Sequence, residues 1–393
     1  MSYTTAPKSK VLTGLRLAAA ALVFCPAAAL ASGPGATGVQ VLKTDVSPRA
    51  FGMGGAYVAV SDDVYAVNYN PAGLAQLYLP EASAMYLSGF EDASLNYFSF
   101  GMPLPIEGLA GFDKPGLAVS ALFSDSGEFT YNSIGASGGV TSLNMDAEST
   151  RVIALSYGEK VYADQVNLEG FKLDLEQYLG LSVKYIGSEL LETYSASAVA
   201  FDAGWLMRDP GLGLSIGASI TNFGSGLQYY REAAPLPSTV RVGASYQRPT
   251  VMSQSLLLAG EADFYLEEKL KSFRAGLEYH FQEIFSFRLG YRGGEENSGA
   301  TGGLGVRYEN FAMDFGLSLG GEVYNASQVS FSYKFSGWRS GDMVKKPRQY
   351  KDPGTRDERK AQPARPSRAE PEKRRRSEPE KPQKKDSDFF WIY

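Results

Sequence analysis

Cysteine and histidine are almost missing from the chain, and this scarcity removes several kinds of chemistry. Among 393 residues there is one cysteine, Cys25, and one histidine, His280. Cys25 lies in an N-terminal leader that we expect to be removed, so the mature chain has no thiol. Disulfides and thiolate metal centres are therefore excluded from the mature chain, and a single imidazole cannot build a histidine cluster. We predict no metal and no cofactor.

Long apolar runs are also scarce. After residue 31, no stretch approaches the roughly 18 apolar residues that a membrane helix needs. Residues 1–31 have the features of a signal peptide: a basic start, an apolar run from Leu17 to Leu30, and a small-residue cleavage site that ends at Ala31. We therefore expect an exported protein.

What the chain does have is alternation of apolar and polar side chains, in segment after segment. Phe311, Met313 and Phe315 fall on one parity, and Asp314 and Gly316 fall on the other. Since successive side chains of a strand point to opposite faces, each segment has one apolar and one polar face. Repeated segments of about ten residues closed by turns are typical of a transmembrane β-barrel.

The alternation predicts an all-β fold, a transmembrane antiparallel barrel of about 14 strands. An even number of strands returns both chain ends to the periplasm. The Gly- and Ser-rich stretch 126–148 is expected to be the longest loop, and 159–173 is either a loop or a strand extension. The expected strands are 81–90, 92–103, 115–125, 149–158, 174–188, 191–208, 211–224, 235–248, 253–266, 270–283, 285–293, 299–309, 310–321 and 325–336.

The same parity sorts the charged residues toward the inside of the barrel. Facing Lys or Arg toward lipid would cost about 2–4 kcal/mol each at the midplane, and this register avoids that cost. The predicted lumenal polar wall consists of Lys184, Arg241, Glu261, Asp263, Arg274, Glu278, His280, Arg288, Arg292, Arg307, Asp314 and Lys334.

Charge and composition divide the chain further. Residues 32–340 contain 19 Lys and Arg against 33 Asp and Glu, whereas 341–388 contain 16 against 10. We predict four parts: a signal peptide (1–31), an N-terminal plug (32–80), the barrel (81–336), and a disordered basic periplasmic tail (337–393) that ends in the aromatic peptide Phe389–Tyr393. The tail is too poor in apolar residues to offset its chain entropy by burial.

One ordered motif precedes the first expected strand. It contains Arg49, a cluster from Gly52 to Ala56, the pair Asp62-Asp63, and Asn70-Pro71-Ala72-Gly73. Asn70 can cap a helix, and Pro71 at the first helical position loses no hydrogen bond. The cluster of Gly52, Gly54 and Gly55 permits close approach of the backbone to a barrel wall.

This motif resembles the N-terminal region of the PorV/PorQ family, which is similar to the FadL-type outer-membrane transporters of long-chain fatty acids. The resemblance implies a fourteen-stranded barrel in which the N-terminal segment folds inward as a plug, or hatch. The plug-motif residues are Arg49, Gly52, Gly54, Gly55, Asp62, Asp63, Asn70, Pro71 and Gly73. Asp62 and Asp63 are expected to pair with lumenal arginines such as Arg288 or Arg292. The motif either holds the plug in place or contacts a substrate directly.

No catalytic constellation is predicted, and we expect no enzymatic activity. His280 could pair with a serine such as Ser245 or Ser286, but its place among lumenal charges favours a hydrogen-bonded polar role. Glu261 and Asp263 could suggest acid–base work, but the nearby cations favour a salt-bridged wall.

The tail is basic, but an exported chain makes nucleic acid an improbable partner. The mixture of Lys, Arg, Glu and Pro indicates a solvated tether, and Phe389–Tyr393 is either a docking peptide or a remnant without a partner. The favoured function is to bind or pass hydrophobic small molecules, such as long-chain fatty acids, through a plugged lumen in the outer membrane, surrounded by outer-membrane lipid. The alternative is a component of a protein secretion or surface-attachment system, anchored by the barrel, with a periplasmic or secretion-system partner on the tail.

Overall fold

The computed structural model describes residues 33, 35–89, 93–134, 139–168, 171–249, 254–294, 298–320 and 326–336. The predicted signal peptide (1–31) and the predicted tail (337–393) lie outside the described residues. Of the helices in the described ranges, none is both long enough and apolar enough to cross a membrane.

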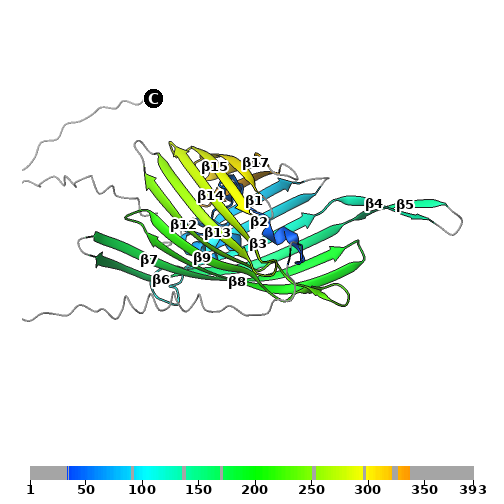
Figure 1. Ribbon diagram of the computed structural model, residues 1–393. Helices are drawn as coiled ribbons and strands as arrows, with labels where there is room; N and C mark the ends of the chain where they lie inside the picture. Colours follow the sequence, from blue (N-terminus) through cyan, green and yellow to red (C-terminus); the bar gives the residue numbers. More distant parts are fainter. Residues whose placement is uncertain are drawn as a thin grey trace, which may run out of the picture. The chain divides into compact units, whose positions relative to one another are not determined.

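Fourteen antiparallel strands close into a barrel, which confirms the predicted fold class and strand number (Figure 1). Neighbours in sequence are neighbours in the sheet, and β1 pairs with β18, Glu81 opposite Lys334, to close it. The barrel strands are β1 (Glu81–Ser88), β2 (Ser94–Pro103), β3 (Gly116–Asp125), β6 (Glu148–Leu168), β7 (Phe171–Leu190), β8 (Tyr194–Asp209), β9 (Leu214–Gly224), β12 (Thr239–Pro249), β13 (Ser255–Tyr265), β14 (Leu270–Phe281), β15 (Phe285–Gly294), β16 (Gly299–Tyr308), β17 (Phe311–Ser318) and β18 (Ser327–Lys334).

The expected strands all correspond to barrel strands, and the stretch 159–173 largely extends β6 and β7. The expectation of a loop over 126–148 was wrong. This stretch contains a two-stranded hairpin, β4 (Glu128–Ile134) with β5 (Val140–Asp146). Its polar residues alternate with apolar ones too briefly to be recognised among the glycines and serines. A second short pair, β10 (Leu227–Gln228) and β11 (Ala233–Ala234), lies between β9 and β12.

The two faces of the wall differ as the alternation predicts. Phe273, Leu289 and Phe311 are exposed on the outer face, each about 60% accessible (61%, 62% and 61%). The residues beside them on the other parity, such as Arg274 and Arg288, are buried in the interior. An apolar outer face around a polar interior is the arrangement of a barrel that spans a membrane.

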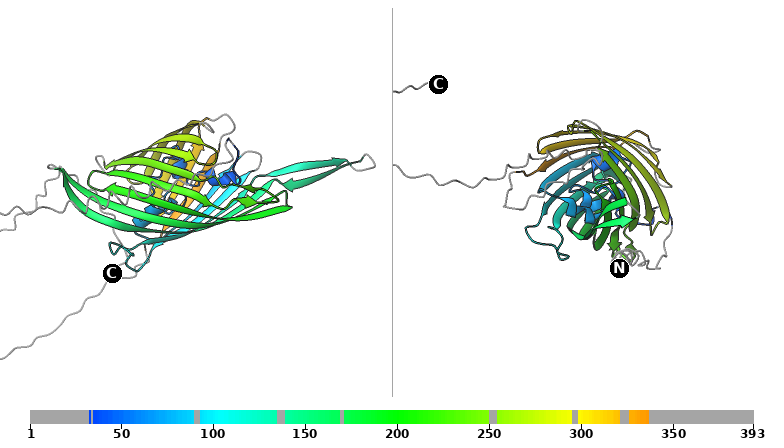
Figure 2. Two further views of the ribbon diagram at one scale, coloured as in Figure 1. Left: turned by 60° about the horizontal axis from the view of Figure 1, so that its bottom comes forward. Right: turned by 90° about the vertical axis from the view of Figure 1, so that its left-hand side faces the viewer.

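Most of residues 35–80 lie inside the barrel, and we call residues 35–80 the inner segment. Figure 2 shows its short helices enclosed by the strands in the end-on view. The helices are η1 (Gln40–Lys43), α2 (Pro48–Gly52), α3 (Ala66–Tyr69) and η2 (Pro71–Gln76). We call the end of the barrel where β1 begins and β18 ends the terminal end, and the opposite one the far end.

Candidate functional site: the inner segment and the lumenal wall

The helices of the inner segment begin where local chemistry places them. The Ser47 side chain accepts a hydrogen bond from the N–H of Ala50, and Pro48 occupies the first position of α2. The Asn70 side chain accepts from the N–H of Ala72 at 3.2 Å, with Pro71 next. The predicted cap at Asn70 is therefore confirmed, although it starts a 3-10 helix. Its amide also donates to the Trp205 carbonyl of the wall at 3.0 Å.

The glycines of the motif meet the wall directly. A Cβ on Gly52 would lie 3.0 Å from the Cα of Gly303 in β16. Gly54 has a φ of +69°, and a Cβ there would lie 2.7 Å from the Tyr291 carbonyl oxygen in β15. Gly54 therefore requires glycine, and a Cβ at Gly52 would crowd the main chain of Gly303, so main chain packs on main chain as the sequence predicts.

The barrel wall also contributes glycines to this close contact, and the sequence pattern did not predict them. Gly116, Gly158, Gly180 and Gly204 lie directly opposite one another across β3, β6, β7 and β8. A Cβ on Gly180 would lie 2.2 Å from the Ala72 nitrogen, and one on Gly204 would lie 2.1 Å from the Asn70 side-chain oxygen. Glycine inside a strand often marks the close approach of another backbone. Their inward parity was therefore the signal that could have found them.

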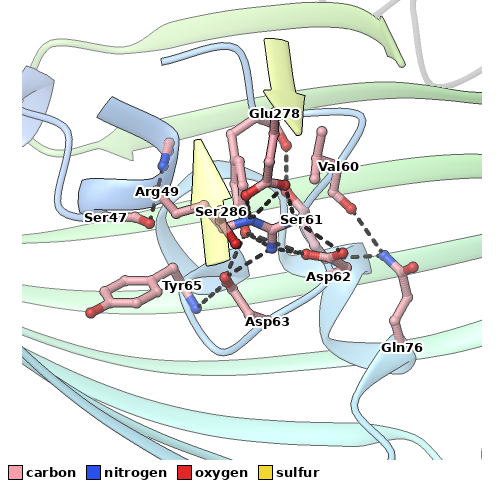
Figure 3. Close-up of polar contacts among 12 residues, drawn as sticks. Ser47, Arg49, Val60, Ser61, Asp62, Asp63, Tyr65, Gln76, Glu278 and Ser286 are labelled. Atoms are coloured by element: carbon pink, nitrogen blue, oxygen red, sulfur yellow. Dashed lines mark hydrogen bonds and ion pairs between the residues drawn. The ribbon is translucent and has the colours of Figure 1, made fainter. Parts of the chain in front are cut away.

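Buried charges join the inner segment to the opposite wall (Figure 3). The Arg49 guanidinium donates to Glu278 of β14, with Nη2–Oε2 at 2.8 Å, and also to Asp62. Glu278 accepts from the Arg288 Nε at 2.7 Å on its other oxygen. The Tyr57 hydroxyl donates to Asp63 at 2.6 Å. Opposite charges with hydrogen bonds are the condition under which buried ions are tolerated.

A second ionic cluster surrounds Asp45. Its carboxylate accepts from Arg274 at 3.0 Å and from Arg292. Arg274 also bridges to Asp263 at 2.8 Å within the wall. Burial by itself would raise the pKa of Asp45, but the charges of Arg292 and Arg274 outweigh it and lower that pKa to about 2.

The prediction that Asp62 and Asp63 pair with Arg288 or Arg292 was wrong. Both acids face Arg49 of their own segment, while Arg288 binds Glu278 and Arg292 binds Asp45. The chain folds back after α2, so the nearer cation is local. Burial raises the pKa of both acids; Arg49 reverses this for Asp62, whereas Asp63, with the Asp62 charge beside it, keeps a raised pKa.

The wall carboxylate Glu261 has a different task from ion pairing. Its Oε2 accepts the backbone N–H groups of Tyr57 and Val58, each at 2.7 Å. These amides begin the chain reversal after the Gly52–Ala56 cluster. The wall therefore supplies the acceptor that the inner segment's own backbone lacks.

The other predicted wall residues divide between lumen and rim. Lys184 is buried and pairs with Asp202 at 2.8 Å. Arg241 is buried over the Tyr69 ring, and Asp314 lies 2.7 Å from Arg288. Lys334 is half-buried, 3.7 Å from Glu81. Arg307 keeps the inward parity of the wall but is exposed, since it adjoins the β16–β17 turn at the terminal end.

His280 does meet a serine. Its Nδ1 lies 2.7 Å from the Ser286 hydroxyl, and its Nε2 lies 3.1 Å from Glu278. Ser245, the other candidate, donates instead to the Ala59 carbonyl at 3.1 Å. Ser286 is buried, and Glu278 already engages two guanidinium groups. His280 and Ser286 are therefore arranged as hydrogen-bonded polar residues of the barrel wall.

Part of the lumen at the far end is apolar. Wall residues on β1–β3 and β6–β8 face inward there and form one buried cluster with inner-segment residues from Val39 to Leu77. Val41 and Leu42 pack against this cluster. The wall members are Met85, Leu87, Leu95, Tyr97, Ala118, Leu122, Val152, Ala154, Ile186, Ala198 and Ala200. Beside it lies a cavity of about 20 Å³, lined by Asn68 and Arg241 among others, room for one water molecule.

A clasp holds the start of the inner segment over this apolar region. Glu268, in the turn between β13 and β14, accepts hydrogen bonds from Thr37 at 2.6 Å and Lys43 at 2.9 Å. Gln40 adds a third contact to the same carboxylate at 3.3 Å. Residues 37–43 are thus tied to the barrel rim by this carboxylate and by the Gly38 N–H, which donates to the Pro235 carbonyl at 2.9 Å.

Several solved structures have a similar fold. TbuX, the toluene transporter of Ralstonia pickettii, shares 16% identity over 74% of this chain and 98% of that chain, with a TM-score of 0.45. TodX, the toluene transporter of Pseudomonas putida, shares 12% identity over 77% and 97%, with a TM-score of 0.44. A FadL homologue from Pseudomonas aeruginosa shares 11% identity over 74% and 98%, with a TM-score of 0.44. Comparison of the sequence with family models and with curated proteins gives no match.

Proposed function

We propose that the protein is an outer-membrane barrel of the FadL-like kind, related to PorV/PorQ proteins, which binds or passes hydrophobic small molecules such as long-chain fatty acids. The observation that carries this proposal is the apolar part of the lumen at the far end. A lumen built only to hold a structural segment through ion pairs could be polar throughout. Here the inner segment instead covers apolar wall with Val39, Val41, Leu42 and Val46.

In this proposal the inner segment acts as the hatch, and only its first part moves. Residues 47–76 are fixed by buried ion pairs and by backbone contact with wall glycines. Residues 37–43 are tied through Glu268 and through a backbone hydrogen bond from Gly38 to Pro235. Release of that clasp would withdraw Val39, Val41 and Leu42 and leave apolar wall free for a ligand. Burial of apolar ligand surface supplies the driving force, about 25 cal/mol per Å².

A matched pair of lumenal variants on β6 tests this function. Val152→Thr places a hydroxyl in the apolar part, and Thr150→Val does the reverse two residues away on the same face. Uptake of a fluorescent long-chain fatty acid into proteoliposomes should fall roughly fivefold or more for Val152→Thr, because an unpaired hydroxyl costs about 1–3 kcal/mol. Thr150→Val should not reduce uptake. Equal uptake by protein-free liposomes and by the wild type would refute the proposal.

A second candidate function, secretion or surface attachment, is favoured by the β4–β5 hairpin, which extends away from the lumen (Figure 1). On this proposal the barrel anchors a surface on which a partner docks. Deleting residues 341–393 tests the part of it that assigns a partner to the tail: co-purifying proteins should be lost while fatty-acid uptake persists.

A further inference from the structure

The hairpin of β4 and β5 is a two-stranded ribbon beyond the barrel. Within the part of the chain that the structure describes, its strands pair with one another alone, from Glu128 opposite Asp146 to Ile134 opposite Val140. Figures 1 and 2 show it projecting from the far end. The ribbon continues the β3–β6 pair through backbone hydrogen bonds from Ser126 to Glu148 at 2.9 Å and from Ala147 to Gly127 at 3.0 Å. A two-stranded ribbon without a third strand is only marginally stable in water, so burial against a partner would stabilise it.

The two faces of the ribbon differ sharply. On one face Phe129 lies opposite Met145, and Tyr131 lies opposite Leu143. Tyr131 is 53% exposed and Leu143 is 55% exposed. The opposite face is polar along most of its length, with hydrogen bonds from Thr130 to Asn144 at 3.0 Å and from Ser142 to Asn132 at 2.6 Å. An unpartnered apolar face backed by a satisfied polar one is what an interaction surface requires.

The edges of the ribbon are open to strand addition. Natural edge strands are usually protected by lysine, by proline or by a covering element. Neither β4 nor β5 contains Lys, Arg or Pro, and within the described residues neither pairs with a barrel strand. An extended peptide could therefore add to an edge and place alternate side chains on the apolar face.

The neck of the ribbon, where Asp125 and Asp146 join it to the barrel, is acidic. Its negative charge favours a basic partner. No Lys or Arg occurs from residue 124 to residue 150. Asp146 donates its N–H to Glu192 at 3.1 Å, and the neighbouring Asp125 charge raises the pKa of its exposed carboxyl. Such a neck repels a second copy of itself and an anionic lipid surface, and it attracts cations.

We propose that the β4–β5 ribbon docks an extended, basic segment of a partner protein, which adds to a ribbon edge and lays alternate apolar side chains over Tyr131 and Leu143. The inference is independent of the transport function, since the ribbon lies outside the lumen.

Peptide binding tests the proposal with the full-length protein in phosphatidylcholine nanodiscs. The probe is a fluorescein-labelled 12-residue peptide of alternating Lys and Val, and its matched control alternates Glu and Val. The affinity of the Lys peptide, measured by anisotropy, should fall at least tenfold in the Y131S/L143S variant. In T130A/N144A, which alters the polar face, it should change less than twofold. Heat-modifiable gel migration verifies an intact barrel in each variant.

The Lys peptide should also bind more weakly as salt rises, and the Glu peptide should not bind. Equal affinity of wild type and Y131S/L143S, or equal affinity for the two peptides, overturns the proposal. A fluorophore on L143C, in a chain with Cys25 replaced, distinguishes a membrane from a protein partner. Quenching of it by brominated lipid without peptide would mean that the bilayer covers this face, and would likewise overturn the proposal.

Discussion

At the scale of single residues, the unusual feature is how many charges lie out of water inside the barrel. Glu278 is fully buried, yet two guanidinium groups and His280 surround it. A buried ion is costly unless paired, and loss of one partner leaves the others uncompensated. The lumen therefore stabilises the protein through matched charges, each of which depends on the next.

Glu278→Gln should be severely destabilising, because it leaves Arg49 and Arg288 facing a neutral amide. The expected loss in the free energy of unfolding is about 3–5 kcal/mol. Urea titration in detergent micelles, followed by tryptophan fluorescence, measures it. Asp164→Asn, at an exposed site on β6, is the control and should stay within about 0.5 kcal/mol of wild type. Similar stability of the two variants would contradict the ionic role assigned to Glu278.

Asp45 should make stability depend on acid. Its pKa is lowered from 3.8 to about 2 in the folded protein, so its contribution is fully present above about pH 4 and is lost as pH falls toward 2. The contribution is about 2 kcal/mol. Unfolding titrations from pH 5 to pH 2 should show a smaller acid loss for Asp45→Asn than for wild type. Parallel pH profiles would show that the Arg274 and Arg292 charges do not act on this carboxyl.

At the scale of elements, the inner segment and the wall are packed main chain to main chain. The row of glycines from β3 to β8 lies against Asn70 to Leu74, and Gly217 of β9 lies against Val58. A side chain at these positions has no space, so strand propensity is sacrificed for contact.

Gly180→Val and Gly217→Val should therefore prevent proper closure, although valine favours strands. A Cβ would lie 2.2 Å and 2.3 Å from inner-segment backbone atoms at these two sites. The fraction of heat-modifiable folded protein on a gel measures the effect. Gly260→Val is the matched control, because a Cβ at this strand position meets open space. If all three variants folded equally, the close contact would be irrelevant to stability.

At the scale of the whole molecule, the barrel is built with its apolar side outward and its polar side around an internal segment. The inner segment supplies counter-charges for Glu278, Arg274 and Arg292, and backbone amides for Glu261. The wall and its contents therefore form one folding unit, and neither satisfies its polar groups alone.

Deleting residues 35–80 should abolish refolding of the barrel in detergent, since several buried charges would lose their partners at once. Deleting residues 341–393 should leave refolding yield unchanged, because the described lumen uses none of those residues. Gel migration before and after heating measures both. A barrel that refolds efficiently without residues 35–80 would show that the wall is self-sufficient.

Much of this architecture could be predicted because alternation is a local property. The parity of Phe311, Met313 and Phe315 decides which face meets an apolar surrounding, and repetition of that parity gives the strands and their number. The cap at Asn70 and the close approach at Gly54 follow equally from local backbone chemistry. The division into signal peptide, plug, barrel and tail stays a prediction, as do the roles of the site residues.

Which groups meet across the lumen depends on how the strands and the inner segment come together in three dimensions. Arg49 rather than Arg288 faces Asp62, Glu261 binds amides rather than a cation, and Gly180 receives the backbone of Ala72. These contacts depend on the stagger between strands and on the path of the inner segment, neither of which a period of two residues encodes. The alternation of residues sets the two faces of each strand, and closure of the barrel sets what each inward face contacts.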